Sequence, residues 1–432
     1  MKNIFFDKHG NVAVIFAIVL LPMLSSLGAA VDITRAWSAK SAMQAALDSA
    51  ALMVSKEMPG LSAAQITQKT QTYFSALVGR PELQGIKITA TYTTSASSGS
   101  SIAASASSAM NTEFLKVVGF PSLGLNVKSN TSWGNTRTRI ALALDTTGSM
   151  KDDGKLSAMQ SASKRLVDQL SANATVTGDV YISLVPFADY VNVNKSNYAK
   201  PWFDWSDWNE VNGDCTINGG DKTQTKCKSK GGVWTPDEHS TWNGCVTDRD
   251  EDYDVKKTPP GLVDASTQFQ PEQATCPVPI IPLTYDWASL KARIDQMTAS
   301  GATNQPVGMA WAWLSLQPTE PLKAPAEDSG FEYKKYLIVL SDGLNTKNKK
   351  AGNGVDYSAY VDGRQRLLCD NIKADGITIY AVQVNTDKDP ESSVLKYCAS
   401  GTDNFFMLTS ASQITSAFDA IGTKMSKLRV SK

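Results

Sequence analysis

The sequence predicts an α/β protein in which an N-terminal transmembrane helix and a small α+β region precede a doubly wound, mostly parallel sheet. Three observations predict this architecture. The N-terminus carries an uncharged apolar run long enough to cross a bilayer. Beyond residue 139, strand-like and helix-like segments alternate, which is typical of a parallel sheet with helices on both faces. An insertion rich in cysteine and tryptophan, at about residues 192–279, interrupts this alternation.

The membrane segment is expected at about residues 11–31, which read NVAVIFAIVLLPMLSSLGAAV without a charged side chain. A helix rises about 1.5 Å per residue, so this run matches a hydrocarbon core about 30 Å thick. Lys2 and Lys8 precede the run, and positive flanks favour the cytoplasmic side. We therefore expect a single-pass membrane protein with a cytoplasmic N-terminus and the bulk of the chain on the other side.

A cleaved signal peptide is the alternative interpretation of this run, because Gly28 and Ala30 are small residues at the spacing of a cleavage site. The apolar run is longer than the apolar region of a usual signal peptide. The residues after it remain rich in helix-favouring Ala, Leu, Met and Lys. These features favour a retained anchor helix within residues 1–57, and both interpretations export the rest of the chain.

The six cysteines are typical of a chain that forms disulfides outside the cytoplasm, because their number is even. Zinc binding is disfavoured, since no Cys-x-x-Cys pair occurs. Cys369 and Cys398 flank the predicted strand GITIYAVQV from adjoining predicted helices, so we predict that they pair. Three connectivities remain open for the four cysteines of the insertion, which are Cys215, Cys227, Cys245 and Cys276.

Residues 58–135 are expected to form the small α+β region. A helix comes first, and three segments that alternate small, β-branched and polar residues follow as strands. The helix is expected at residues 61–78 and the strands at 85–94, 101–110 and 124–133. A flexible linker is the alternative interpretation of the Ser-rich stretch 93–108.

Residues 136–432 are expected to form the doubly wound domain. Its strands are predicted at residues 139–145, 179–187, 336–343, 376–384 and 404–409, with a short edge strand at 280–285. Its helices are predicted at residues 155–170, 287–297, 306–316, 362–374, 390–399 and 411–428. The insertion is too long for a bare loop, so we expect a disulfide-linked surface element. Most of its five tryptophans are expected to form a small core around the disulfides, with an exposed contact surface as the alternative.

Oxygen-bearing side chains lie at three expected junctions between strands and helices, where open α/β sheets bind their ligands. The stretch DTTGS places Asp145, Thr147 and Ser149 at the end of a strand. Thr303 precedes a predicted helix, and Asp342 ends the most apolar strand. Each residue alone would also serve as a helix cap, but Mg²⁺ prefers oxygen ligands of these kinds. Their joint occurrence predicts a metal site built from three loops.

The region from Arg139 to Lys432 resembles a von Willebrand factor A-type domain. The metal-ion-dependent adhesion site of that family has an Asp-x-Ser-x-Ser motif, a later Thr and a later Asp, which DTTGS, GATN and LSDG match in order. Thr replaces the middle Ser of the motif here, and the long insertion departs from the compact family pattern. The resemblance implies a divalent cation, Mg²⁺ or another, that binds an acidic group of a protein partner. The implied metal ligands are Asp145, Thr147, Ser149, Thr303 and Asp342.

The N-terminus resembles a second family through the stretch HGNVAVIFAIVLLPMLSSLGAAVDITRAWSAKSAMQAALDSAALM. This looks like the TadE/TadG-like segment of Flp/Tad pilus-assembly proteins, and its tandem with an A-type domain points to the TadG-type member. Prepilins of that system are cut after a Gly and carry Glu at the fifth position beyond it, whereas Ile15 follows Gly10 at that distance. The resemblance implies a permanent anchor in a bacterial inner membrane, with the bulk of the chain in the periplasm. Pilus-assembly components or pilin are the implied partners.

Composition argues against two other classes of function. Lys+Arg and Asp+Glu both number 42, so the chain lacks the basic excess of a nucleic-acid binder. His9 and His239 are the only histidines and no nucleophile motif is recognisable, so we do not expect an enzyme. We expect a component of pilus assembly. The alternative is a released or surface-exposed adhesin that binds host or substrate through the same metal site.

Overall fold

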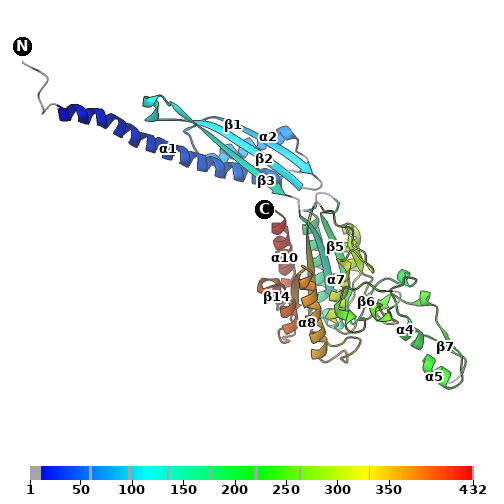
Figure 1. The fold of residues 1–432 in the computed structure, drawn as a ribbon. Coiled ribbons are helices and arrows are strands. Elements are labelled where there is room, and N and C mark those ends of the chain that lie inside the picture. Colours follow the sequence, from blue (N-terminus) through cyan, green and yellow to red (C-terminus); the bar gives the residue numbers. More distant parts are fainter. Residues whose placement is uncertain are drawn as a thin grey trace, which may run out of the picture. The chain divides into compact units, whose positions relative to one another are not determined.

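The computed structural model describes residues 11–57, 61–95, 99–133, 136–172, 174, 177–217, 222–261, 264–329 and 331–430. The chain divides into two compact units (Figure 1). Met1–Asn135 form the first unit together with Val430–Lys432, and Thr136–Arg429 form the second.

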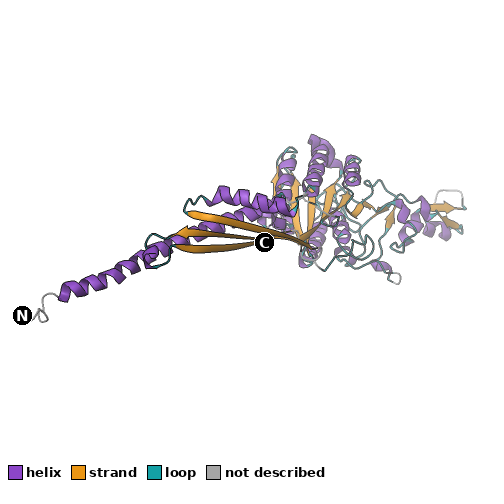
Figure 2. Ribbon diagram, turned by 90° about the horizontal axis from the view of Figure 1, so that it is seen from above, coloured by secondary structure: helices purple, strands orange, loops and turns teal. Residues whose placement is uncertain are grey.

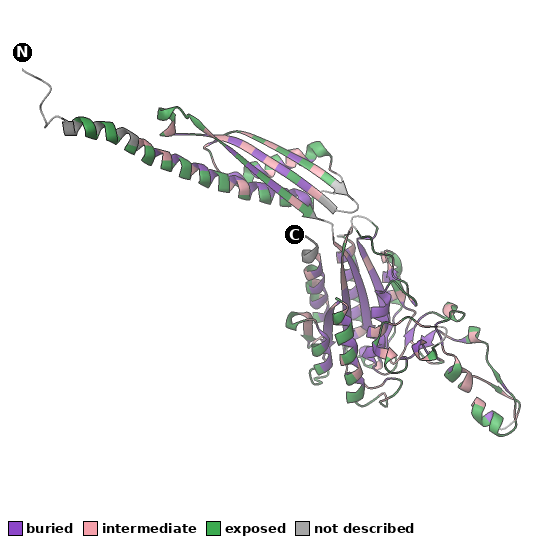
Figure 3. Cartoon of the chain, in the orientation of Figure 1, coloured by how far each residue is buried: buried purple, intermediate pink, exposed green. Residues whose placement is uncertain are grey.

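The first unit is built on α1 (Asn11–Lys56), a single helix of 46 residues. Between Val14 and Leu27, the large apolar side chains of α1 that the structure describes are exposed, and they are coloured green in Figure 3. By length and composition this helix is able to cross a membrane, and within the described residues it alone meets that test. The predicted N-terminal apolar helix is therefore confirmed as a candidate membrane anchor.

The second half of α1 packs on an antiparallel sheet with the order β1–β2–β3. These strands are β1 (Leu83–Ser95), β2 (Gly99–Asn111) and β3 (Ser122–Trp133), and α2 (Ala63–Val78) packs against α1 and β1. Small and apolar residues recur every three or four positions along α1, which gives it one buried face: Ala36, Ala39, Met43, Leu47 and Ala50. The predicted helix and three strands are confirmed. The linker interpretation of residues 93–108 is wrong, because the described residues of that stretch are paired in β1 and β2.

The second unit alternates strands and helices along the chain. Its main strands are β4 (Thr136–Asp145), β5 (Val180–Phe187), β12 (Glu332–Ser341), β13 (Thr378–Val384) and β14 (Phe405–Leu408). The shorter strands β6 (Val191–Asn192), β9 (Cys245–Val246), β10 (Pro271–Glu272) and β11 (Ile281–Thr284) join the same sheet. The helices are α3 (Lys155–Ser171), α6 (Trp287–Asp295), α7 (Gln305–Ser315), α8 (Ala359–Ala374), α9 (Ser393–Cys398) and α10 (Gln413–Val430).

The central part of this sheet is parallel and covered on both faces (Figure 2). The strands run in the order β10–β9–β6–β5–β4–β12–β13–β14, with β11 paired to β5, and the neighbours from β5 to β14 are parallel. Ala141 and Ala143 of β4 lie in one core with α7, α8 and α9, whereas Ile140 and Leu142 lie in another with α3, α6 and α10. Successive side chains of a strand point to opposite faces, so a strand buried on both sides is apolar throughout. The predicted doubly wound α/β fold is confirmed.

The insertion is partly built into the sheet. Its strands β9 and β10 extend the sheet beyond β6, and its rings of Trp202, Trp208 and Trp242 join the core on the α7 face. The expectation of a separate core is therefore wrong for these three tryptophans, because the sheet itself supplies their packing surface. The outer part contains α4 (Ser206–Val211), β7 (Gly213–Cys215), α5 (Gln224–Ser229) and β8 (Trp234–Pro236).

All six cysteines form disulfides. Cys369 pairs with Cys398, which confirms the predicted bond and joins α8 to α9. The sequence left three connectivities open for the four cysteines of the insertion. In the structure each cysteine pairs with its neighbour along the chain, as Cys215–Cys227 and Cys245–Cys276. The first pair closes the small β7–β8 ribbon, where Trp234 lies opposite Cys215. The second bond starts from β9 at the extended edge of the main sheet.

Candidate metal centre

Two carboxylates meet at the carboxyl end of neighbouring strands. Asp145 is the last residue of β4, and Asp342 directly follows β12. These strands are parallel and in register, with Leu144 opposite Leu340, so both carboxylates leave the sheet at the same edge. Both are almost fully buried. The sheet topology thus provides the convergence that the spacing of DTTGS and LSDG predicted.

Main-chain hydrogen bonds join the three expected loops to one another. Ser300 N donates to Thr146 O at 2.7 Å and Gly148 N donates to Gly301 O at 3.0 Å, which ties the DTTGS loop to the segment before α7. On the other side, Thr346 N donates to Thr303 O at 2.9 Å. The segment before α7 therefore lies between the other two loops.

Four of the five predicted side chains form one continuous cluster. Thr147 N donates to Asp145 Oδ1 at 2.7 Å, and the Thr147 and Ser149 hydroxyl oxygens are 3.1 Å apart. Ser149 Oγ donates to Asp342 Oδ1 at 2.8 Å. The buried Thr303 lies next to Gly343, the residue after Asp342, since its Oγ1 is 3.8 Å from the position that a Cβ on Gly343 would take. The structure brings all five residues to one place, and their role as metal ligands stays a prediction.

Two further side chains at this place were not predicted from the sequence. The ammonium of Lys155 lies 2.8 Å from Asp342 Oδ2 and 2.9 Å from Asp387 Oδ2, and the hydroxyl of Ser341 donates to Asp145 Oδ2. Asp342 Oδ2 accepts no well-aligned hydrogen bond from the described residues. Its contact with Lys155 is therefore an electrostatic attraction between opposite charges. The position of Ser341 within LSDG was the available signal for it. No sequence signal pointed to Lys155 beyond its place at the start of a predicted helix.

A network of hydrogen bonds from amide side chains fixes the position of Ser341. Gln305 Nε2 donates to Ser341 Oγ at 3.1 Å and to Gly343 O at 3.0 Å. The main-chain N–H of Gln305 donates in turn to Asn345 Oδ1 at 2.9 Å, and Asn345 Nδ2 donates to Asp362 Oδ1 at 2.8 Å. Each of these side chains is buried, so these bonds restrict the loop after β12 to one arrangement.

The charges of the cluster are incompletely compensated. Burial, and secondly the negative charge of Asp342, raise the pKa of Asp145 to about 7. Burial alone would lower the pKa of Lys155, but Asp342 and Asp387 outweigh it and leave this pKa raised. The buried cluster holds the two carboxylates of Asp145 and Asp342 and one ammonium, that of Lys155, which contacts Asp342. Asp387 is 54% exposed, so water screens its charge.

This donor set suits a hard divalent cation. Two carboxylates and three hydroxyls are all oxygen ligands, and Mg²⁺ prefers few carboxylates together with waters. Within the described ranges, no group of three or more His, Cys, Asp or Glu side chains forms a metal-binding cluster, so a cation at this edge relies on hydroxyl ligands. The uncompensated charge around Asp145 and Asp342 gives such a cation an electrostatic reason to bind.

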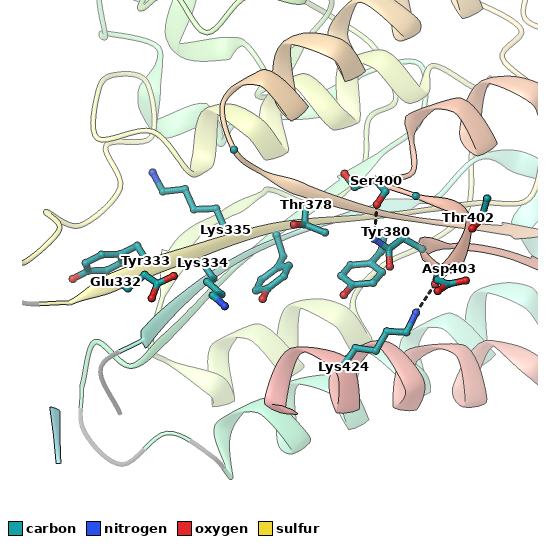
Figure 4. Close-up of a pocket in the computed structure, with 14 residues that line it drawn as sticks. Glu332, Tyr333, Lys334, Lys335, Thr378, Tyr380, Ser400, Thr402, Asp403 and Lys424 are labelled. Atoms are coloured by element: carbon teal, nitrogen blue, oxygen red, sulfur yellow. Dashed lines mark hydrogen bonds between the residues drawn. The ribbon is translucent and has the colours of Figure 1, made fainter. Parts of the chain in front are cut away.

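A separate hollow of about 860 Å³ lies at the other end of β12 (Figure 4). Its lining runs from Glu332 to Tyr336 and includes Tyr380 and Lys424, whose ammonium donates to Asp403 O. Asp342 lies beyond the opposite end of the same strand. The hollow is wide, and it contains none of the predicted metal ligands.

Comparison with a family model bears on the other end of the chain. Residues 10–58 match the family model described as "Putative Flp pilus-assembly TadE/G-like". The N-terminal segment is TadE/G-like. This confirms the resemblance of the N-terminus and covers most of α1. A comparison with curated proteins found no match.

Solved structures match the chain at low sequence identity. The pilus adhesin SpaC from Lactobacillus rhamnosus GG in its open conformation is 11% identical, with 81% of this chain and 35% of SpaC covered and a TM-score of 0.40. The vWF domain of the type V pili tip protein Mfa5 from Porphyromonas gingivalis is also 11% identical, with coverages of 68% and 97% and a TM-score of 0.38. Proximal thread matrix protein 1 from the mussel byssus, with a zinc occupied MIDAS motif, is 15% identical, with coverages of 68% and 46% and a TM-score of 0.35. The fold assignment rests on the strand order of this chain.

Proposed function

We propose that this protein is a membrane-anchored component of Flp/Tad pilus assembly that binds a protein partner through a divalent cation. The cation, Mg²⁺ in the first instance, is held by Asp145, Thr147, Ser149, Thr303 and Asp342. The TadE/G-like segment supports the assignment to pilus assembly. The proposal of metal-dependent binding is supported mainly by the convergence of three loops at the carboxyl ends of β4 and β12.

The charge of the cluster supports an acidic group as the feature that the partner presents. Asp145, Asp342 and Lys155 together carry one net negative charge when all three are ionised. A divalent cation reverses this to one net positive charge, which attracts a carboxylate into a coordination position that the protein leaves open. The cation supplies this attraction. The residues of the chain supply its ligands and their fixed geometry.

The site is proposed to bind and not to catalyse. The described residues around the cluster are carboxylates, hydroxyls, amides and one lysine that is engaged by Asp342 and Asp387. His239, the histidine within the described residues, stacks on Trp205 in the insertion at a centroid distance of 3.9 Å. It belongs to the aromatic packing there and is not part of the metal cluster.

The anchor is proposed to remain in the inner membrane with the second unit in the periplasm. The apolar helix and the lysines before residue 11 support this orientation. Three disulfides support an oxidising compartment for the rest of the chain.

A pull-down with the full-length chain tests the proposal. The tagged protein is purified from detergent-solubilised membranes of piliated cells, once with Mg²⁺ and once with a chelator, and pilus components are identified in each eluate. We expect capture with Mg²⁺ and a loss of at least tenfold with the chelator or with Asp145→Ala. Asp152→Ala is the matched control, because Asp152 is an exposed carboxylate in the same loop.

The outcomes separate the parts of the proposal. If Asp145→Ala and the chelator leave capture and piliation unchanged, the metal-dependent binding is refuted. If the wild-type chain captures no pilus component under either condition and its deletion leaves piliation intact, the pilus-assembly role is refuted.

A further inference from the structure

Apolar side chains gather in the loop between β2 and β3, residues 112–121, here called the tip loop. Val117 is 81% exposed and Phe120 is 60% exposed, and Phe114 and Val118 are each about half-exposed. A soluble surface rarely concentrates this many large apolar side chains in ten residues. Val117 and Val118 belong to a short 3₁₀ helix within the loop (Leu115–Val118), and Phe114 directly precedes it.

The carboxylate of Asp32 fixes the tip loop to α1. It accepts hydrogen bonds from the main-chain N–H groups of Glu113 at 3.0 Å, Phe114 at 2.8 Å and Leu115 at 2.8 Å. Asp32 itself is fully buried by this contact. A buried carboxylate with three donors is a strong and directional attachment. The exposed apolar side chains are therefore held in place and are not a loose segment.

Close packing one turn earlier on α1 strengthens the attachment. A Cβ built on Gly28 would lie only 2.5 Å from the Cβ of Phe114, so the helix and the loop touch where α1 has no side chain. Gly28 and Asp32 are four residues apart and share one helix face. The tip loop thus lies alongside the last turn of the apolar run.

This position sets the level of the tip loop relative to a bilayer. Gly28 lies three residues before the end of the run at Val31, or about 4.5 Å along the helix. Leu27 and Val31, which flank it, expose their apolar side chains. Trp37 follows at 74% exposure, and tryptophan is enriched at the membrane–water interface. A lipid surface at this level would reach the tip loop and α1 together.

We propose that the tip loop inserts into the interfacial layer of the bilayer beside α1, as a second contact of the first unit with the membrane. The inference rests on the proposed role of α1 as a membrane anchor. Phe114, Val117, Val118 and Phe120 enter the boundary between headgroups and acyl chains, to the depth of about 5–10 Å that interfacial elements reach. Lys116 and Glu113, whose charged groups are 3.3 Å apart, remain at the headgroups.

We assign a lipid layer to this surface because the apolar side chains of the tip loop are continuous with the exposed apolar side chains of α1. The same bilayer that covers Leu27 and Val31 ends at the level at which Asp32 and Gly28 hold the loop. Two contacts prevent rotation of the first unit about the axis of α1. A single helix would leave that rotation free.

Site-directed spin labelling of the full-length protein tests the proposal. Single cysteines are introduced by Leu27→Cys, Val117→Cys and Ala64→Cys, labelled with a nitroxide, and reconstituted in vesicles of phosphatidylethanolamine and phosphatidylglycerol. The native cysteines are all in disulfides and do not compete for the label. Collisions of the label with oxygen, which concentrates in lipid, are compared with collisions with a water-soluble nickel complex. Leu27 is the lipid reference, and the exposed Ala64 of α2 is the aqueous reference.

We expect the ratio of oxygen to nickel accessibility at residue 117 to be at least threefold above that at residue 64 and to approach that at residue 27. A value at residue 117 equal to that at residue 64, with residue 27 in lipid, overturns the proposal and leaves the anchor intact; it would assign the surface to a protein partner. An aqueous value at residue 27 overturns the anchor and this inference together.

A second variant tests the attachment by Asp32. Asp32→Ala removes the acceptor of all three main-chain bonds, so the label at residue 117 should become more mobile and lose at least half of its excess oxygen accessibility. The control Asp48→Ala removes a carboxylate further along α1 that is exposed. Equal behaviour of the two variants would refute the role of Asp32.

Discussion

The ammonium of Lys155 lies 2.8 Å from Oδ2 of Asp342, and both side chains are almost completely shielded from water. One positive charge of the chain therefore already stands beside the pair of carboxylates at the end of β4 and β12. It reduces the repulsion between Asp145 and Asp342 but does not cancel it. We therefore expect Lys155 to affect both the stability of the sheet edge and the affinity of the proposed site for a cation.

Replacing Lys155 should weaken the fold and strengthen cation binding. Lys155→Met leaves the Asp342 carboxylate buried without its partner, which costs about 3–5 kcal/mol of unfolding free energy. The same change makes the cluster more negative, so Mg²⁺ should bind more tightly. Urea unfolding in chelator and calorimetric titration with Mg²⁺ measure the two effects.

The exposed Lys151, in the loop before α3, supplies the control Lys151→Met. That variant should change neither quantity beyond about 0.5 kcal/mol. Weaker binding of Mg²⁺ by Lys155→Met than by the control would contradict the electrostatic account.

Asp248 should make stability fall between acid and neutral pH. Burial raises the pKa of this carboxyl to about 6, against the hydrogen bonds that it accepts from Asn304 and Lys349. A group whose pKa is higher in the folded than in the unfolded chain stabilises the fold when protonated. That contribution is complete below about pH 4 and is lost as the pH rises through about 6, for a total of about 3 kcal/mol.

Asp248→Asn should remove this dependence. Asn304 Nδ2 and Lys349 N both donate to the same oxygen, Asp248 Oδ2, so an amide oxygen can accept both bonds. Chemical unfolding at pH 4, 5, 6 and 7 should show a flatter profile for Asp248→Asn than for wild type. The half-exposed Asp250 provides the control Asp250→Asn, which should keep the wild-type slope. A parallel profile for all three proteins would count against this assignment.

The two disulfides of the insertion should contribute differently. Cys245–Cys276 closes 31 residues at the edge of the main sheet, and its loss by Cys245→Ser with Cys276→Ser should cost about 3–4 kcal/mol of global stability. Cys215–Cys227 closes 12 residues in the outer ribbon, so its loss should expose that ribbon to proteolysis and leave the main transition nearly unchanged. Calorimetry and limited proteolysis of the two double variants measure this. Equal shifts of the main transition would be inconsistent with the placement of β7 and β8 outside the main sheet.

The mature protein should retain its apolar helix. Gly28 packs against Phe114 and Asp32 attaches the tip loop, so this end of α1 is part of the folded first unit. Intact-mass measurement of protein extracted from membranes should give a chain that includes residues 11–31. A mature N-terminus near Val31 in the soluble fraction would instead favour the released adhesin.

Local sequence patterns predicted most elements of the fold. The run Ile140–Leu144 is apolar because β4 is buried on both faces, and this property is visible without any partner strand. The Ser-rich strand β2 was harder to assign. Its Ala104 and Ala106 lie in one core with the buried face of α1, and short side chains at such positions resemble those of a linker.

Local sequence patterns likewise predicted some residues of the candidate site and missed others. DTTGS, GATN and LSDG carry a recognisable spacing, so Asp145, Thr303 and Asp342 were predicted. Lys155 was missed because a lysine at the start of a helix is ordinarily solvated, and only the fold around Asp342 and Asp387 buries it. The tip loop was missed because its apolar residues are unremarkable until Asp32, about 80 positions earlier, fixes where they lie.

The sequence by itself determined the apolar N-terminal helix, the alternation of strands and helices, the three oxygen-bearing motifs and the pairing of Cys369 with Cys398. These follow from hydrophobic periodicity and short-range spacing, which are local properties of the chain. Only the tertiary structure decided that three tryptophans of the insertion complete the main core, and that Lys155 and Ser341 join the two carboxylates. It also placed the apolar tip loop beside the end of the apolar run of α1. Those relations depend on contacts between residues far apart in the chain. Such residues bury one another only after the sheet has brought them together, so a local sequence pattern does not reveal the contact.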